Sequence, residues 1–135
     1  MSLPTLPADK ANHYVYGTAA ALGGAALGLW IAMALARSRV LPPWPWLVLV
    51  LAAACAVLVA WLAGRAKEKA DAHANACAYE IYLSAVDAAI GIGAMPPPPY
   101  TAPHEVSAED VHYTAAGALP VSGALLLVAL ATLWR

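Results

Sequence analysis

The charged residues of this chain are confined to a few short segments, and three long segments carry none. All eight carboxylates and all four histidines lie within residues 9–13 or 68–112. Residues 14–36, 44–63 and 116–134 contain no charged side chain. An uncharged apolar segment of about 18 or more residues is long enough to cross a bilayer as a helix. The pattern therefore predicts three membrane-spanning helices with the carboxylates and histidines on one side.

The composition agrees with a membrane protein. The chain is 62% hydrophobic and 11% charged, whereas soluble domains are about 25% charged. A net charge of −1 argues against nucleic acid as a partner, because phosphate binding requires clustered Lys and Arg. We expect an all-α integral membrane helical bundle, one membrane domain over residues 1–135, with the lipid bilayer as a partner. Pro4 and Asp9 precede the first apolar segment and are not typical of a cleavable signal peptide, so we expect the first helix to be retained.

The predicted spans cover about residues 12–37, 45–66 and 110–134. The first span is rich in small residues, and Gly24 and Gly28 form a Gly-x-x-x-Gly pair. In lipid, small residues allow helix backbones to approach closely. We expect this face to pack within the chain, with homodimerisation as the alternative.

Residues 72–107 are expected to form an insert outside the hydrocarbon. Residues 79–90 carry polar side chains every three or four positions, which is typical of a helix lying in the interface. The alternative is a fourth span over about residues 76–95, which would place two carboxylates at membrane depth, where they are unfavourable without partners. The prolines of residues 96–103 predict a stiff, extended connector.

The third span is expected to begin near Ser107. Glu109 and Asp110 follow it, and acidic residues are favourable at the positive end of a helix dipole. Pro120 is expected to kink the helix, because it removes one backbone hydrogen bond.

The charges near the spans predict the orientation weakly. The basic residues on the side of the N-terminus are Lys10, Arg65, Lys67 and Lys69. Those on the opposite side are Arg37, Arg39 and Arg135, and the first two of these lie in a very short loop. Basic residues in short loops stay in the cytoplasm. We therefore expect the N-terminus outside and the C-terminus inside.

Three polar motifs lie at span ends that antiparallel packing brings to one side. Within each motif, residues three or four positions apart share a helix face. The motifs are Asp9, Lys10, His13 and Gly17; then Gly64, Lys67, Glu68 and Asp71; then Asp110, Thr114 and Gly117. We expect these polar groups to converge, with Gly17, Gly24, Gly28, Gly64 and Gly117 as helix-packing positions.

The motifs Asp-Lys-x-x-His, Lys-Glu-x-x-Asp and Asp-x-x-x-Thr-x-x-Gly, in this order, resemble those of VanZ-like small integral membrane proteins. The closest resemblance is to relatives encoded by phages and prophages or described as bacterial lipoproteins. The resemblance covers residues 7–17, 62–73 and 107–119. Thr114 stands where such relatives often carry a second Asp, and the insert before the third span is long. The resemblance implies a phage or bacterial origin and a multi-pass protein of the bacterial inner membrane, but no particular activity.

The polar cluster is interpreted as a structural clasp that fixes the helices near the membrane surface. Its expected members are Asp9, Lys10, His13, Glu68, Asp71, Asp110 and Thr114. No catalytic residue and no cofactor are predicted, because no nucleophile or phosphate-binding loop accompanies the cluster. The alternative is a site for a divalent metal, held by His13, Glu68, Asp71 and Asp110, since imidazole and carboxylate ligands hold such ions. An acid–base site acting on a lipid headgroup is the third interpretation.

These observations predict a non-enzymatic accessory or assembly component that acts through helix association. Its partners would be copies of itself or a larger membrane or virion assembly. A holin-like pore former is one alternative, and a metal- or lipid-headgroup-binding protein is another.

Overall fold

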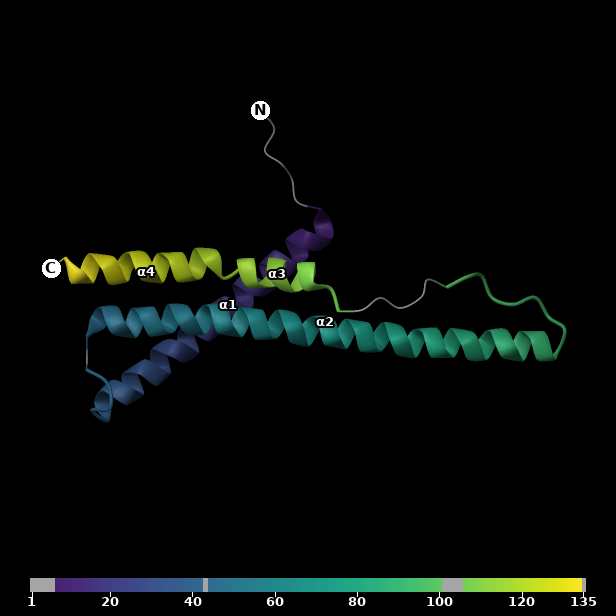
Figure 1. Cartoon of the computed structure of the whole chain (residues 1–135), viewed down its shortest axis with the longest axis horizontal. Coiled ribbons are helices and arrows are strands. Elements are labelled where there is room, and N and C mark those ends of the chain that lie inside the picture. The colour runs from purple at the N-terminus through teal and green to yellow at the C-terminus, as the bar shows by residue number, and fades with distance from the viewer. Residues whose placement is uncertain (1–6, 43, 101–105, 135) are drawn as a thin grey trace, which may run out of the picture. The chain divides into compact units, whose positions relative to one another are not determined.

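The computed structural model describes residues 7–42, 44–100 and 106–134, and all regular structure within them is helical. The helices are α1 (Ala8–Arg37), α2 (Pro45–Gly91), α3 (Ala108–Ala116) and α4 (Leu119–Leu133) (Figure 1). Three segments are long and apolar enough to cross a membrane: Ala8–Arg37, Pro45–Gly91 and Ala108–Leu133. The predicted all-α fold with three such helices is confirmed.

The chain forms two compact units. The first comprises Met1–Arg65 and Ala108–Arg135, and the second comprises Ala66–Ser107. The first unit therefore contains α1, the apolar part of α2, α3 and α4. The second contains the polar part of α2 and the segment that follows it.

Helix α1 begins directly after Pro7, whose carbonyl accepts a hydrogen bond from the Ala11 N–H at 2.9 Å. Asp9 lies in the first turn and Arg37 in the last, so both charges complement the helix dipole. The helix ends at Ser38, whose N–H and Oγ both donate to the Ala34 carbonyl at 3.0 Å. The Ala34 carbonyl therefore accepts a second hydrogen bond, from the Ser38 side chain, at the end of the helix.

Helix α2 is longer than expected. Residues 79–90, predicted as a separate interfacial helix, continue α2 without interruption to Gly91. The reason is local, because residues 65–78 are mostly Ala, Lys and Glu and include neither Pro nor Gly. The helix ends where Gly93 adopts a φ of 68°. The Gly93 N–H donates to the Ile90 carbonyl, and the Ala94 N–H donates to the Ala89 carbonyl. This pair of hydrogen bonds is a Schellman motif.

Aromatic side chains mark both ends of the apolar part of α2. The rings of Trp44 and Trp46 stack with centroids 5.7 Å apart. The Arg65 guanidinium lies 4.9 Å from the Trp61 ring centroid. Residues 45–65 rise about 30 Å at 1.5 Å per residue, which matches the hydrocarbon thickness of a bilayer. Trp and Arg at these positions are typical of the two membrane–water interfaces.

The third apolar segment is broken between α3 and α4. The break lies at Gly117 and Ala118, one turn before Pro120. Proline has no N–H to donate to the carbonyl four residues earlier, so one backbone hydrogen bond of a continuous helix cannot form there. Pro120 then lies in the first turn of α4, where its missing N–H is harmless.

The core of the first unit is made of small side chains, and its surface carries large apolar ones. Leu27, Trp30 and Leu127 are exposed on that surface. A water-soluble protein buries such residues, whereas helices in lipid associate through small residues that permit close contact. The buried cluster consists of Ala21, Ala25, Ala56, Ala60 and Ala118. The first unit therefore has the distribution of large and small side chains that is expected of helices packed in a bilayer.

The Gly-x-x-x-Gly face of α1 packs against α2. A Cβ atom at Gly24 would lie 2.7 Å from the Cys55 carbonyl oxygen, and one at Gly28 would lie 2.8 Å from the Ala52 Cα. Real Cβ atoms essentially never approach other atoms so closely. The two helices are therefore in direct backbone contact at both glycines.

Candidate functional site

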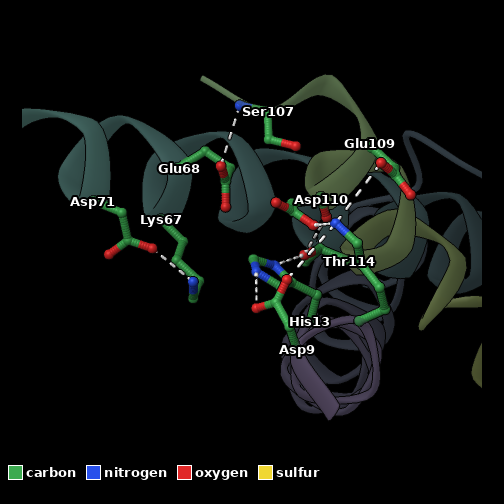
Figure 2. A network of polar contacts seen from close by, with 10 residues as sticks. Asp9, His13, Lys67, Glu68, Asp71, Ser107, Glu109, Asp110 and Thr114 are labelled. Carbon is green, nitrogen blue, oxygen red and sulfur yellow. Dashed lines mark hydrogen bonds and ion pairs between the residues drawn. The ribbon is translucent and has the colours of Figure 1, made fainter. Parts of the chain in front are cut away.

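The predicted polar cluster is divided between the two units. Asp9, Lys10 and His13 of α1 meet Asp110 and Thr114 of α3 within the first unit. Figure 2 shows the labelled side chains of Asp9, His13, Asp110 and Thr114 turned toward one another. Glu68 and Asp71 belong to the second unit, where they have their own partners.

Thr114 lies at the point where α1, α2 and α3 meet, and its side chain is completely buried. A Cβ atom at Gly17 would lie 1.8 Å from the Thr114 carbonyl oxygen. One at Gly64 would lie 2.9 Å from the Thr114 Cβ. Glycines on the two neighbouring helices thus make the space that the threonine fills.

The break between α3 and α4 is held by α1. The Thr18 hydroxyl lies 2.9 Å from the Gly117 carbonyl and 3.0 Å from that of Tyr14, and can donate to either. A Cβ atom at Gly117 would lie 2.3 Å from the Tyr14 carbonyl oxygen. The Thr18 hydroxyl therefore offers a hydrogen-bond donor to a carbonyl at the break between α3 and α4. Such a donor matters in lipid because no water is present to bond the carbonyl.

The imidazole of His13 is buried and oriented by Thr114. The Thr114 hydroxyl donates its hydrogen to the Asp110 carbonyl at 2.9 Å. The same oxygen lies 3.2 Å from His13 Nδ1. Because that hydrogen is already used, the oxygen accepts from His13, so Nδ1 carries a proton in this network. Nε2 then faces Asp9, 3.8 Å from its Oδ1.

Lys10 lies among three carboxylates. Its Nζ forms an ion pair and hydrogen bond with Asp110 Oδ1. The Asp9 and Glu109 carboxylates lie 3.7 and 3.8 Å from the same nitrogen. The ring centroid of Tyr113 is 5.8 Å from it. These contacts join the first turn of α1 to the first turn of α3, where acidic residues also meet the positive end of the helix dipole.

Glu68 and Asp71 make contacts within the second unit. Glu68 Oε2 accepts a hydrogen bond from the Ser107 N–H at 3.2 Å, which links the two ends of that unit. Asp71 pairs with Lys67 one helical turn earlier at 2.7 Å (Figure 2). Exposed pairs of this kind contribute little to stability.

Three tyrosines form a cluster in the second unit that the sequence did not single out. The ring of Tyr100 lies 6.2 Å from Tyr79 and 5.6 Å from Tyr82, between centroids. Tyr79 and Tyr82 share a face of α2 because they are three residues apart. Tyr100 follows four consecutive prolines, and no spacing rule predicts where an extended segment returns to a helix. Glu109 and Tyr113 were also missed as neighbours of Lys10.

Asp9, His13 and Asp110 together have the geometry of a candidate metal site. Each offers one ligand atom, and these atoms lie within 4.8 Å of one another. This set shares His13 and Asp110 with the set predicted from the sequence and adds Asp9. Glu68 and Asp71, the other predicted ligands, belong to the second unit.

Comparison with known proteins finds no match, so a function must be argued from the fold and the site geometry. No protein-family model matches the chain, and no curated protein or solved structure matches it significantly. The resemblance to VanZ-like proteins stays a prediction from the three motifs. In the part of the chain that the structure describes, all regular structure is helical, and three helices are long and apolar enough to cross a membrane.

Proposed function

We propose that the chain is a small multi-pass membrane protein of phage or bacterial origin that acts without catalysis, as an accessory or assembly component. It works by associating through its helices with further copies or with other membrane or virion proteins. The observation that carries the proposal is the contrast between the polar groups of the first unit, which bind one another, and its apolar outer surface.

The polar groups are arranged to hold helices together. Lys10 and Asp110 join α1 to α3, and His13 and Thr114 join the same helices one turn further along. Within the described parts of the chain, every buried side-chain nitrogen or oxygen has a hydrogen-bond partner. A clasp of this kind fixes the register of two helices, which is a structural task.

The outer surface of the first unit has positions that suit helix association. A Cβ atom at Gly23 of α1, or at Gly123 of α4, would have no neighbouring atom within 4 Å. Both glycines lie in uncharged, largely apolar segments. In lipid, such positions allow another helix to approach closely.

Cysteine crosslinking in native membranes tests the association. Cys55 and Cys77 are first replaced by Ser, and single cysteines are then introduced as Gly23→Cys, Gly123→Cys and, as a buried control, Ala21→Cys. We expect crosslinked species at residue 23 or 123 and none at residue 21. Their mass distinguishes a second copy from another protein. Only monomer at both outward positions would contradict the proposal.

Induced expression separates this function from a holin-like pore. We expect the protein to accumulate while the membrane potential, followed with a voltage-sensitive dye, stays constant. An abrupt depolarisation at a fixed time after induction would instead support pore formation. The matched control is expression of a variant with Lys10→Gln, which weakens the clasp without changing the apolar surface.

The proposed location is the bacterial inner membrane, with the N-terminus outside and the C-terminus inside. Support comes from Arg37, the last residue of α1, and from Arg39, which lies in the short turn between α1 and α2. A phosphatase fused after Arg135 should be inactive, and a fluorescent protein fused there should be bright. The phosphatase chosen is one that is active only in the periplasm, so an active fusion would contradict the proposed orientation.

A further inference from the structure

We propose that Asp9, His13 and Asp110 form a binding site for a divalent transition-metal ion, with Zn²⁺ as the best-fitting ion, and that the Lys10 ammonium competes for this site. The proposal concerns ion binding and regulation of the clasp, and it stands apart from the function proposed above.

The ligand atoms are close enough for one ion to join them. They lie within 4.8 Å of one another, whereas nitrogen and oxygen ligands at about 2.0–2.2 Å from a tetrahedral zinc lie roughly 3.4 Å apart. The separations between ligand atoms must therefore shrink by up to about 1.4 Å. Asp9 can supply the movement, because 69% of its side chain is exposed and it lies in the first turn of α1.

The orientation of His13 is a second observation that is independent of the carboxylates. Metal-binding histidines hold one ring nitrogen in a hydrogen bond so that the other faces the ion. In this chain Thr114 holds Nδ1, and Nε2 is the nitrogen on the side of Asp9. His13 is 4% exposed, so the direction of its ring is fixed by packing as well as by the hydrogen bond.

The Lys10 ammonium lies beside Asp9 and Asp110, the two carboxylate ligands of the proposed site. Its single positive charge is surrounded by Asp9, Glu109 and Asp110. A divalent ion would bring twice that charge to the same carboxylates. The lysine stem is flexible and its side chain is 18% exposed, so the ammonium can withdraw into water. Binding is then an exchange of one cation for another, which lowers the apparent metal affinity of the native chain.

The ligand types select the ion. One imidazole and two carboxylates suit Zn²⁺, and Mn²⁺ as a weaker second choice. Mg²⁺ and Ca²⁺ prefer sites made entirely of oxygen. The proposal therefore predicts discrimination against the alkaline-earth ions.

The test is calorimetric titration of the full chain in lipid nanodiscs, first stripped with a chelator, with ZnCl₂ and separately with MgCl₂. We expect one Zn²⁺ per chain and no Mg²⁺ binding. His13→Gln and Asp9→Asn should each weaken Zn²⁺ binding by at least about tenfold, and Thr114→Val by about tenfold through the loss of its hydrogen bond. Lys10→Gln should bind about tenfold more tightly, because the competing cation is gone.

A control is needed for a second zinc-binding pair. His73 Nε2 lies 3.8 Å from the exposed Cys77 Sγ, and such a pair can collect zinc without a built site. The double variant His73→Gln, Cys77→Ser should bind Zn²⁺ as the native chain does. Loss of binding in this variant, or native binding in Asp9→Asn, would overturn the proposal. So would a Lys10→Gln variant with unchanged or weaker affinity. Asp9 is exposed, so its substitution leaves the fold intact even if His13→Gln does not fold.

Discussion

Gly17 of α1 is in backbone contact with Thr114 of α3. A Cβ atom on Gly17 would lie 1.8 Å from the Thr114 carbonyl oxygen and 2.9 Å from its Cα. The obstacle is backbone, which cannot rotate away as a side chain can. The distance between α1 and α3 therefore depends on the absence of a side chain at residue 17.

The first prediction follows from that contact. Gly17→Ala should lower the free energy of unfolding by at least about 1–3 kcal/mol, because the two helices must separate to admit a methyl group. Unfolding by SDS in mixed micelles, followed by far-UV circular dichroism, measures the change. Gly23→Ala on the same helix meets no atom within 4 Å, so it should be neutral or stabilise by up to about 1 kcal/mol. Equal destabilisation by both would contradict the packing.

The second prediction concerns the clasp between α1 and α3. In metal-free buffer, Lys10→Gln should lower the free energy of unfolding, because it removes the charged hydrogen bond to Asp110 that joins α1 to α3. The matched control is Lys67→Gln, which breaks the exposed pair with Asp71 and should change stability by less than about 0.5 kcal/mol. The same unfolding titration compares them. A larger effect at Lys67 would show that the α1–α3 pair does not stabilise the fold.

The third prediction tests whether the Gly-x-x-x-Gly face of α1 is internal. Gly28→Val should destabilise the folded chain by about 1–3 kcal/mol through its collision with α2, since even a Cβ atom there would lie 2.8 Å from Ala52. Gly23→Val is the control on the open face. Unfolding in SDS and the oligomeric state in nanodiscs are measured together. Dissociation of an oligomer by Gly28→Val, with its unfolding unchanged, would place this face between chains.

The fourth prediction concerns the tyrosine cluster of the second unit. Tyr100→Ala should release residues 96–100 from α2, because the Tyr100 ring contacts those of Tyr79 and Tyr82. Each such ring pair contributes about 0.5–1.5 kcal/mol. Proteolysis near residues 96–100 should become faster, and Tyr100→Phe should behave as the native chain because it keeps the ring. Equal cleavage rates in the native chain and Tyr100→Ala would rule the contact out.

The sequence predicted those parts of the fold that depend on local patterns. Uncharged segments marked the three helices that can cross a membrane, and Pro120 marked the interruption before α4. The extension of α2 to Gly91 was missed, because polar periodicity within residues 79–90 was interpreted as a separate helix. Helix-favouring residues join that segment to the apolar one, and nothing between them stops the helix.

The candidate site was predicted in part, for a related reason. Spacing along a helix placed Asp9 with His13 and Asp110 with Thr114, and the structure brings these four together. Spacing does not determine which side chains pair between two helices, so the pairing of Lys10 with Asp110 was not foreseen. Nor does it reveal that Thr114 fills a space left by two glycines, since that depends on the distance between three backbones.

The alanine core of the first unit changes how its energetics must be measured. Alanine scanning assigns importance by removing atoms, but Ala21, Ala25, Ala56, Ala60 and Ala118 have almost none to remove. Such a scan would return a flat profile across this buried cluster. Substituting these alanines by larger residues, such as Val or Leu, would reveal the helix contacts, because the helices approach closely where side chains are small or absent.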